Sequence, residues 1–104
     1  MYVRISKGSY APELHAQVNR RLNESSQSLV PAIRKLPGRI SYYVGADETT
    51  KLMVNVSVWD SLEHALAMGT VSEMAALAKE FIAMDVQFER PIANYPVMWK
   101  LPSD

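Results

Sequence analysis

The stretch LMVNVSVW, residues 52–59, combines residue types that could bind a ligand with a plain aliphatic strand pattern. Successive side chains of a β-strand point to opposite faces, so the stretch divides into two rows. One row is wholly aliphatic: Leu52, Val54, Val56 and Val58. The other offers an amide, a hydroxyl and an indole: Met53, Asn55, Ser57 and Trp59. Polar groups such as Asn55 and Ser57 need partners when buried, which indicates a binding face.

Arg4 and His64 extend this set of candidate residues. Arg4 is basic and lies in an apolar stretch near the start of the chain, where it could hold an anionic oxygen if it faced the same space as Asn55. Alternatively, it pairs with a carboxylate at the rim. Histidine is a common general base, so His64 could accept a proton, but with Asp60 and Glu63 it also fits a solvent-exposed helix start.

The first half of the chain predicts a strand, a long helix and a second strand. Residues 2–6 alternate as a strand does, and apolar residues then recur at helical spacing over 12–36. Pro12 suits a first helical turn, whereas Pro31 predicts a kink or two helices in series. Residues 39–45 predict the second strand, and a polar turn joins it to a third strand at 51–59 as a hairpin.

The second half predicts two short helices and a closing strand. Asp60 with Glu63, and Thr70 with Glu73, are spaced as helix caps. Residues 85–91 read as a connector, and residues 92–100 as a fourth strand that must lie at an edge because Pro96 cannot donate to a sheet.

This order predicts an α+β, ferredoxin-like βαββαβ fold with a four-stranded antiparallel sheet covered by helices on one face. The aliphatic row is expected beneath the helices, which places the row with Asn55 on the uncovered face. Other side chains are expected to join it there: Ser41, Tyr43, Tyr95 and Trp99. Such a face is too apolar to leave wet, and a second copy would cover it in a homodimer.

Composition limits the classes of partner and cofactor. The 104 residues predict a single domain over 1–104, and eleven basic side chains balance eleven acidic ones, which argues against nucleic acid or an anionic membrane as partner. The absence of cysteine fits a cytoplasmic protein, and the start of the chain does not resemble a signal peptide. His15, expected at the surface, is far in sequence from His64, so neither a metal nor another cofactor is predicted.

Three phrases resemble the antibiotic biosynthesis monooxygenase-like domains of the dimeric α/β barrel superfamily: LPGRISYYVGAD, MVNVSVWDSLEHALAM and ANYPVMWKL. The resemblance implies two sheets packed as a dimeric barrel. Some members oxidise phenolic polycyclic substrates without a cofactor, and an Asn and a Trp four residues apart line their pocket, which Asn55 and Trp59 match. Ala65 stands where their Tyr would lie, and Lys79 is the nearest candidate for their Arg. The haem-binding members' His is missing from EMAALAKEF, so haem is not expected.

The resemblance therefore implies a cofactor-independent monooxygenase, an oxidoreductase, that acts on a small aromatic or phenolic substrate in a pocket between the sheet and helices of a homodimer. The candidate catalytic residues are Asn55, Trp59 and His64, and the candidate substrate-binding residues are Asn55, Trp59, Tyr43, Ser57 and Arg4. Two alternatives stay open at this point. The protein is a binding or stress-response dimer without turnover, or a structural homodimer in which Trp59 is a core anchor and the amide of Asn55 is satisfied by the backbone or the dimer mate.

Overall fold

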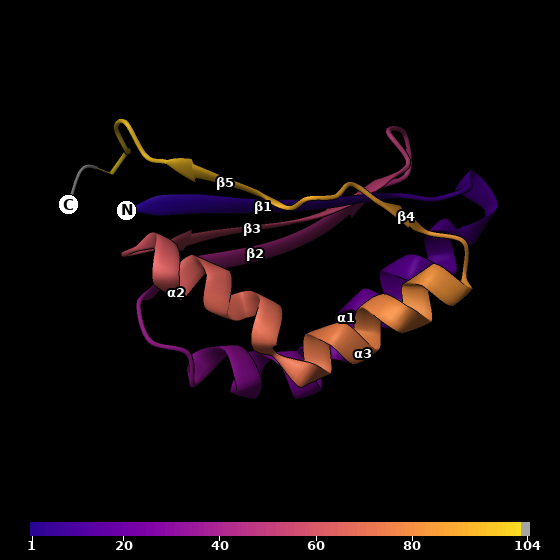
Figure 1. Ribbon diagram of the computed structural model, residues 1–104. Helices are drawn as coiled ribbons and strands as arrows, with labels where there is room; N and C mark the ends of the chain where they lie inside the picture. Colours follow the sequence, from indigo (N-terminus) through magenta and orange to yellow (C-terminus); the bar gives the residue numbers. More distant parts are fainter. Residues whose placement is uncertain (103–104) are drawn as a thin grey trace.

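The computed structural model describes residues 1–102, and its elements follow the expected order. In chain order they are β1 (Tyr2–Ser9), a 3-10 turn η1 (Pro12–Leu14), α1 (His15–Arg34), β2 (Arg39–Asp47), β3 (Leu52–Trp59), α2 (Leu62–Leu66), a 3-10 turn η2 (Ala67–Thr70), α3 (Ser72–Ala83), β4 (Gln87–Phe88) and β5 (Ala93–Pro96). Figure 1 shows the sheet as one layer and α1, α2 and α3 as a second layer on one of its faces.

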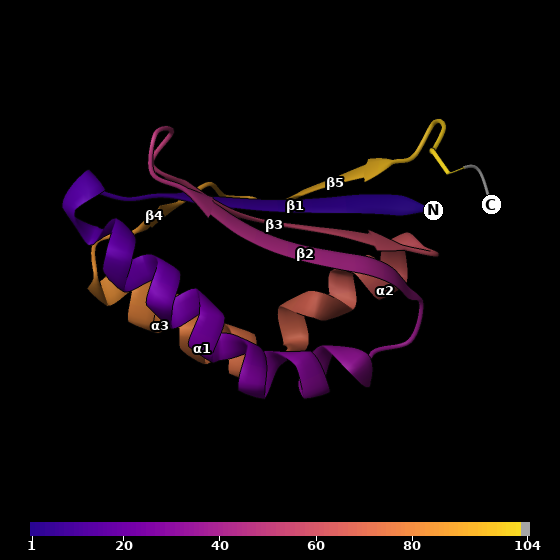
Figure 2. The same ribbon diagram turned by 180° about the vertical axis from the view of Figure 1, so that it is seen from behind.

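The sheet is antiparallel in the order β2–β3–β1, and both β4 and β5 pair with the free edge of β1. This is the ferredoxin-like α+β arrangement that the sequence predicts. The view from behind in Figure 2 shows α1 and α3 side by side beneath the sheet, with no helix on the opposite face. No described helix is long and apolar enough to cross a membrane.

The fourth strand is interrupted, which the sequence did not predict. Only Ala93–Pro96 of the expected 92–100 strand pairs with β1, while β4 lies inside the expected connector. The amide of Glu89 still donates to the carbonyl of Lys7 at 2.9 Å, so the chain follows β1 until residue 89 and leaves it before β5 begins. The break places Arg90 outside the regular ladder.

The helices also differ in detail from the prediction. The run 15–34 is one helix that contains Pro31, so the alternative of two helices in series is wrong. Ser61, rather than Asp60, caps α2, because its Oγ accepts the amide of His64 at 3.2 Å. Helix α3 follows Val71 and has no side-chain cap, so Thr70 does not have the predicted role.

The two rows of β3 face the opposite way from the prediction. Ser57 and Trp59 are fully buried, and Trp59 belongs to the core with residues of α1 and α3 such as Val18 and Phe81. Val58 instead borders a surface groove with Tyr43, on the face without helices. The row of Met53, Asn55, Ser57 and Trp59 therefore packs beneath the helices, and the aliphatic row faces outward.

The side chains on the two faces show why it was wrong to place the more apolar row beneath the helices. The covered, or inner, face carries polar side chains from three strands: Arg4, Ser6, Tyr42, Asn55 and Ser57. The outer face, on the same strands and on β5, carries mostly apolar ones: Val3, Ile5, Tyr43, Val56, Val58 and Tyr95. Assigning the more apolar row to the helices fails because the uncovered face of this sheet is the more apolar one.

A buried hydrogen bond fixes the end of the inner row. The indole Nε1 of Trp59 donates to Ser57 Oγ at 2.8 Å, and both residues are inaccessible to solvent. Ser57→Ala would leave the indole N–H buried without an acceptor. We expect a loss of roughly 1–3 kcal/mol in the free energy of unfolding, measured by urea titration. Ser26→Ala, on the exposed side of α1, is the matched control and should change stability far less. An equal effect of both substitutions would contradict this role of Ser57.

Candidate functional site

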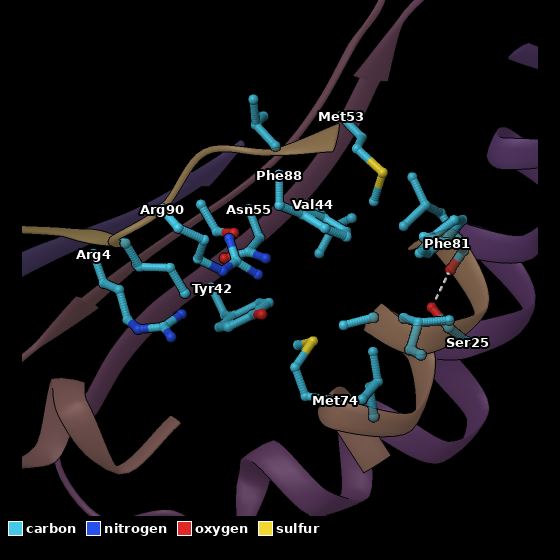
Figure 3. Close-up of a pocket in the computed structure, with 17 residues that line it drawn as sticks. Arg4, Ser25, Tyr42, Val44, Met53, Asn55, Met74, Phe81, Phe88 and Arg90 are labelled. Carbon is cyan, nitrogen blue, oxygen red and sulfur yellow. Dashed lines mark hydrogen bonds between the residues drawn. The ribbon is translucent and has the colours of Figure 1, made fainter. Parts of the chain in front are cut away.

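A cavity of about 70 Å³ lies between the inner face of the sheet and helices α1 and α3. Its apolar walls come mainly from the two helices and β3: Leu22, Leu29, Met53, Met74, Leu77 and Phe81. Its polar side chains are Arg4, Ser6, Ser25, Tyr42, Asn55 and Arg90. Figure 3 shows Arg4, Tyr42, Asn55 and Arg90 gathered at one end, whereas Met53 and Phe81 lie toward the other.

The sheet register brings the polar side chains together. Ser57 of β3 pairs with Arg4 of β1 on one side and with Tyr42 of β2 on the other, so all three share the inner face. Asn55, two residues earlier on β3, shares that face as well. Arg90 enters from the break between β4 and β5 and completes the polar end of the cavity.

Arg4 is a buried cation without a counter-ion. Its side chain is only 7% exposed, and among residues 1–102 it makes neither a hydrogen bond nor an ion pair. Among the described residues, no Asp or Glu lines the cavity. Burial lowers the pKa of the Arg4 guanidinium, the nearby Tyr42 opposes this shift, and the positive charge of Arg90 adds to it. An isolated buried charge is costly, so this end of the cavity favours an anion.

Tyr42 and Asn55 also present unpaired polar atoms. The phenolic oxygen of Tyr42 and the amide oxygen of Asn55 are buried and have no hydrogen-bond partner in the described part of the chain. Burial raises the pKa of Tyr42 to about 12, although the charge of Arg4 acts in the opposite direction. Tyr42 is therefore a neutral phenol at pH 7 and can donate a hydrogen bond to an anionic ligand.

Arg90 is held at the rim by two contacts of its own. It is exposed to solvent, donates from Nη1 to the carbonyl of Glu89 at 2.8 Å, and places its guanidinium 4.8 Å from the ring centre of Phe88. The cation–π contact leaves its remaining N–H donors free to face an anion at the cavity mouth.

The structure brings only two of the predicted site residues, Arg4 and Asn55, into this cavity. Ser57 and Trp59 are bonded to each other in the core and do not line it. Tyr43 is 67% exposed on the outer face.

His64 lies away from the cavity, at the start of α2. Its Nδ1 is 2.5 Å from Asp60 Oδ1, and the hydrogen bond from His64 lowers the pKa of Asp60. Gly38, with a φ of +80°, passes directly over this pair, and a Cβ there would overlap both side chains. The pair thus anchors the entry to β2. Among residues 1–102, no three His, Cys, Asp or Glu side chains group in a way that could hold a metal ion.

Sequence reasoning missed Tyr42 and Arg90. The alternation along β2 would have selected Tyr42 instead of Tyr43 had the inner row been assigned correctly. Arg90 carries no comparable signal, because it reaches the cavity only through the irregular break in the fourth strand.

Comparison with known proteins supports the fold. No family model and no curated protein matches the sequence. Among solved structures, a protein from Deinococcus radiodurans, provisionally named an antibiotic biosynthesis monooxygenase, is 17% identical with a TM-score of 0.74, over 97% of this chain and 96% of that one. SnoaB, a cofactor-independent oxygenase from Streptomyces nogalater, is 12% identical with a TM-score of 0.58, over 98% and 97% of the two chains.

A dimeric ferredoxin-like protein from an uncultured marine organism is also similar, at 14% identity and a TM-score of 0.58 over 96% of each chain. These likenesses confirm the predicted resemblance at the level of the fold.

The raised pKa of Tyr42 predicts a pH-dependent stability. A tyrosine whose pKa is about 12 when folded and about 10 when unfolded holds its proton more tightly in the native state. Its contribution is therefore constant below pH 10 and is lost as the pH rises toward 12, by roughly 1.4 kcal/mol per pH unit. Tyr42→Phe should be less sensitive to alkali than the wild type, measured by urea unfolding at pH 8 and 11. Tyr2→Phe, which removes a hydroxyl outside the cavity, is the control, and equal alkaline profiles for all three proteins would refute this prediction.

Proposed function

Because the chain shares its fold with antibiotic biosynthesis monooxygenase domain proteins, we propose that it is a cofactor-independent monooxygenase acting on a small phenolic substrate in the cavity between sheet and helices. The observation that carries the proposal is the polar end of the cavity, where the cation of Arg4 and the unpaired hydroxyl of Tyr42 lie beside apolar walls, with the amide of Asn55 next to them. This combination suits a ring that bears one anionic oxygen.

In the proposed reaction the substrate supplies all the electrons. The charge of Arg4 favours the phenolate form of the bound phenol, and the amide Nδ2 of Asn55 orients the ring by donating a hydrogen bond to the phenolate oxygen. The phenolate transfers an electron to O2. Over the complete reaction the ring gains one oxygen atom and loses two hydrogen atoms, and the second oxygen atom leaves as water. Trp59, buried behind the cavity, serves as a core anchor in this proposal.

A binding protein without turnover is the second candidate, and the same unpaired polar atoms favour it equally. The two proposals differ in one measurable respect, because only the enzyme consumes oxygen when a phenol is added. A purely structural role would require no cavity. This protein has a cavity, and a buried cation lines it. The absence of cysteine fits a cytoplasmic location, which stays a prediction.

Oxygen uptake with a panel of single-ring phenols tests the activity, and Asn55→Ala tests the site. Removing a hydrogen bond to a charged oxygen should lower kcat/KM or affinity by roughly 10- to 150-fold, while the melting temperature changes little. Asn19→Ala, on the exposed face of α1, is the control. A large loss of stability in Asn55→Ala with unaltered ligand binding would show that Asn55 is structural. If no phenol is consumed but several bind, the binding role replaces the enzymatic one.

The proposal includes a homodimer of single-domain protomers, residues 1–104. The outer face of the sheet is apolar and uncovered, with Tyr43 and Tyr95 67% and 55% exposed and the aliphatic side chains of β1 and β3 between them. The named dimer among the similar folds is consistent with a second copy on this face. The dimer argument thus survives the inversion of the two rows, because the face left open is still the apolar one.

Val56→Lys tests the dimer, because Val56 lies on β3 at the middle of the outer face, opposite Ile5 and Tyr43. A lysine there should convert the protein to an 11.7 kDa monomer in sedimentation equilibrium at micromolar concentration. Val30→Lys places the same change on an exposed position of α1 and should remain dimeric. Circular dichroism confirms that both variants are folded. A wild-type protein that sediments as a monomer would rule the dimer out.

A further inference from the structure

The charge and size of the cavity restrict the ligand more than the proposed reaction does. Two guanidinium groups face the polar end, and no carboxylate side chain within residues 1–102 lines the cavity, so an occupant with a single weakly acidic oxygen would leave positive charge unbalanced. A phenol carries its charge only after losing a proton with a pKa near 10. A carboxylate is anionic at neutral pH, and its two oxygens match the planar fork of an arginine.

The volume means that side chains must move before the apolar part of the cavity can hold even one ring. About 70 Å³ is roughly half of the ~150 Å³ cavity that holds one benzene molecule in an engineered protein core. Met53 and Met74 line the apolar part, and such flexible thioether side chains can move to admit a single ring. A fused polycyclic substrate exceeds this space.

We propose that the natural ligand is a small monocyclic aromatic carboxylate, and that Arg4 determines this specificity by binding the carboxylate group. The ring lies toward Met53, Met74 and Phe81. The hydroxyl of Tyr42 donates a hydrogen bond to a carboxylate oxygen, and Arg90 adds positive charge at the rim. Combined with the proposed oxygenase activity, on which this extension rests, the substrate class becomes the aryl carboxylic acids that carry a hydroxyl group next to the carboxylate, because both groups must reach the polar end with Arg4 and Asn55. The binding step itself requires no turnover.

The buried, unpaired state of Arg4 gives the proposal a distinctive signature. In the ligand-free protein its charge is desolvated and lies near Arg90, so a neutral side chain of similar length should relieve both effects. Arg4→Met should therefore raise the melting temperature of the free protein while removing carboxylate binding. A residue that merely supports the fold would lower the melting temperature when replaced.

The test uses benzoate, which has no phenol to oxidise, and its neutral isostere benzamide as probes in isothermal titration calorimetry. In the wild type, benzoate should bind roughly 10- to 150-fold more tightly than benzamide. Arg4→Met should abolish this difference and Arg4→Lys should reduce it. Arg20→Met, a surface arginine on α1, should leave it unchanged.

Several outcomes would overturn the proposal. Equal affinity of the wild type for benzoate and benzamide would exclude a carboxylate site, as would unchanged benzoate binding in Arg4→Met. Inorganic phosphate binding as tightly as benzoate would exclude the aromatic part. Because benzoate cannot be turned over, tight benzoate binding without oxygen uptake on any phenol would refute the proposed oxygenase while leaving the carboxylate site intact. Oxygen uptake on simple phenols without benzoate binding would refute the carboxylate site and leave the proposed oxygenase intact.

Discussion

The pairing of β3 between β1 and β2 is the constraint on which the rest of the structure depends. Eight consecutive residue pairs join β1 to β3, from Tyr2 opposite Trp59 to Ser9 opposite Leu52. A shift of one residue would exchange the two faces of β3 and move every side chain of its inner row to the outside. In the observed register Arg4, Asn55 and Tyr42 meet beneath the helices, and the valines of β3 line the outer face. Site and outer surface are therefore set by the same pairing.

The fold must offset the cost of the polar end with apolar packing around it. Trp59, Phe81, Met68 and Val18 are among the largest fully buried side chains of the core, and Phe81 also lines the cavity. On the far side of the helices, Arg21 Nε lies 2.6 Å from Glu80 Oε2 and joins α1 to α3, but the pair is exposed and contributes little to stability. Around the polar end, this packing must offset the desolvation of the Arg4 charge, which is costly for a buried ion without a counter-ion.

The inner and outer faces of the sheet have different roles in the proposed function: the inner face binds the ligand, and the outer face forms the dimer contact. On the inner face, Arg4, Tyr42 and Asn55 occupy buried positions that apolar side chains could otherwise fill. The outer face supplies the aliphatic and aromatic side chains that a second sheet can cover. In the proposed homodimer, each protomer would rely on its partner to bury the outer face, whereas the cavity is lined by residues of one chain alone.

The sequence by itself determined the order of elements, the hairpin of β2 and β3, and Asn55 and Arg4 as candidate residues. Each of these follows from local patterns: alternation in strands, helical spacing of apolar side chains, and polar residues where an apolar strand is expected. Alternation, however, defines two rows and does not say which one the helices cover. The usual guide, that the more apolar row is buried, was misleading because both faces of this sheet carry apolar side chains and the outer face carries more.

Only the tertiary structure decided the face, and with it the membership of the site. It moved Tyr43 outside, brought Tyr42 inside, separated Ser57 and Trp59 from the cavity, and left His64 paired with Asp60 at the start of α2. No local pattern in the sequence indicates Arg90, because its place depends on where the fourth strand leaves β1. The physical reason is common to all of these: a strand's neighbours, and not its own sequence, fix which of its two faces meets the helices.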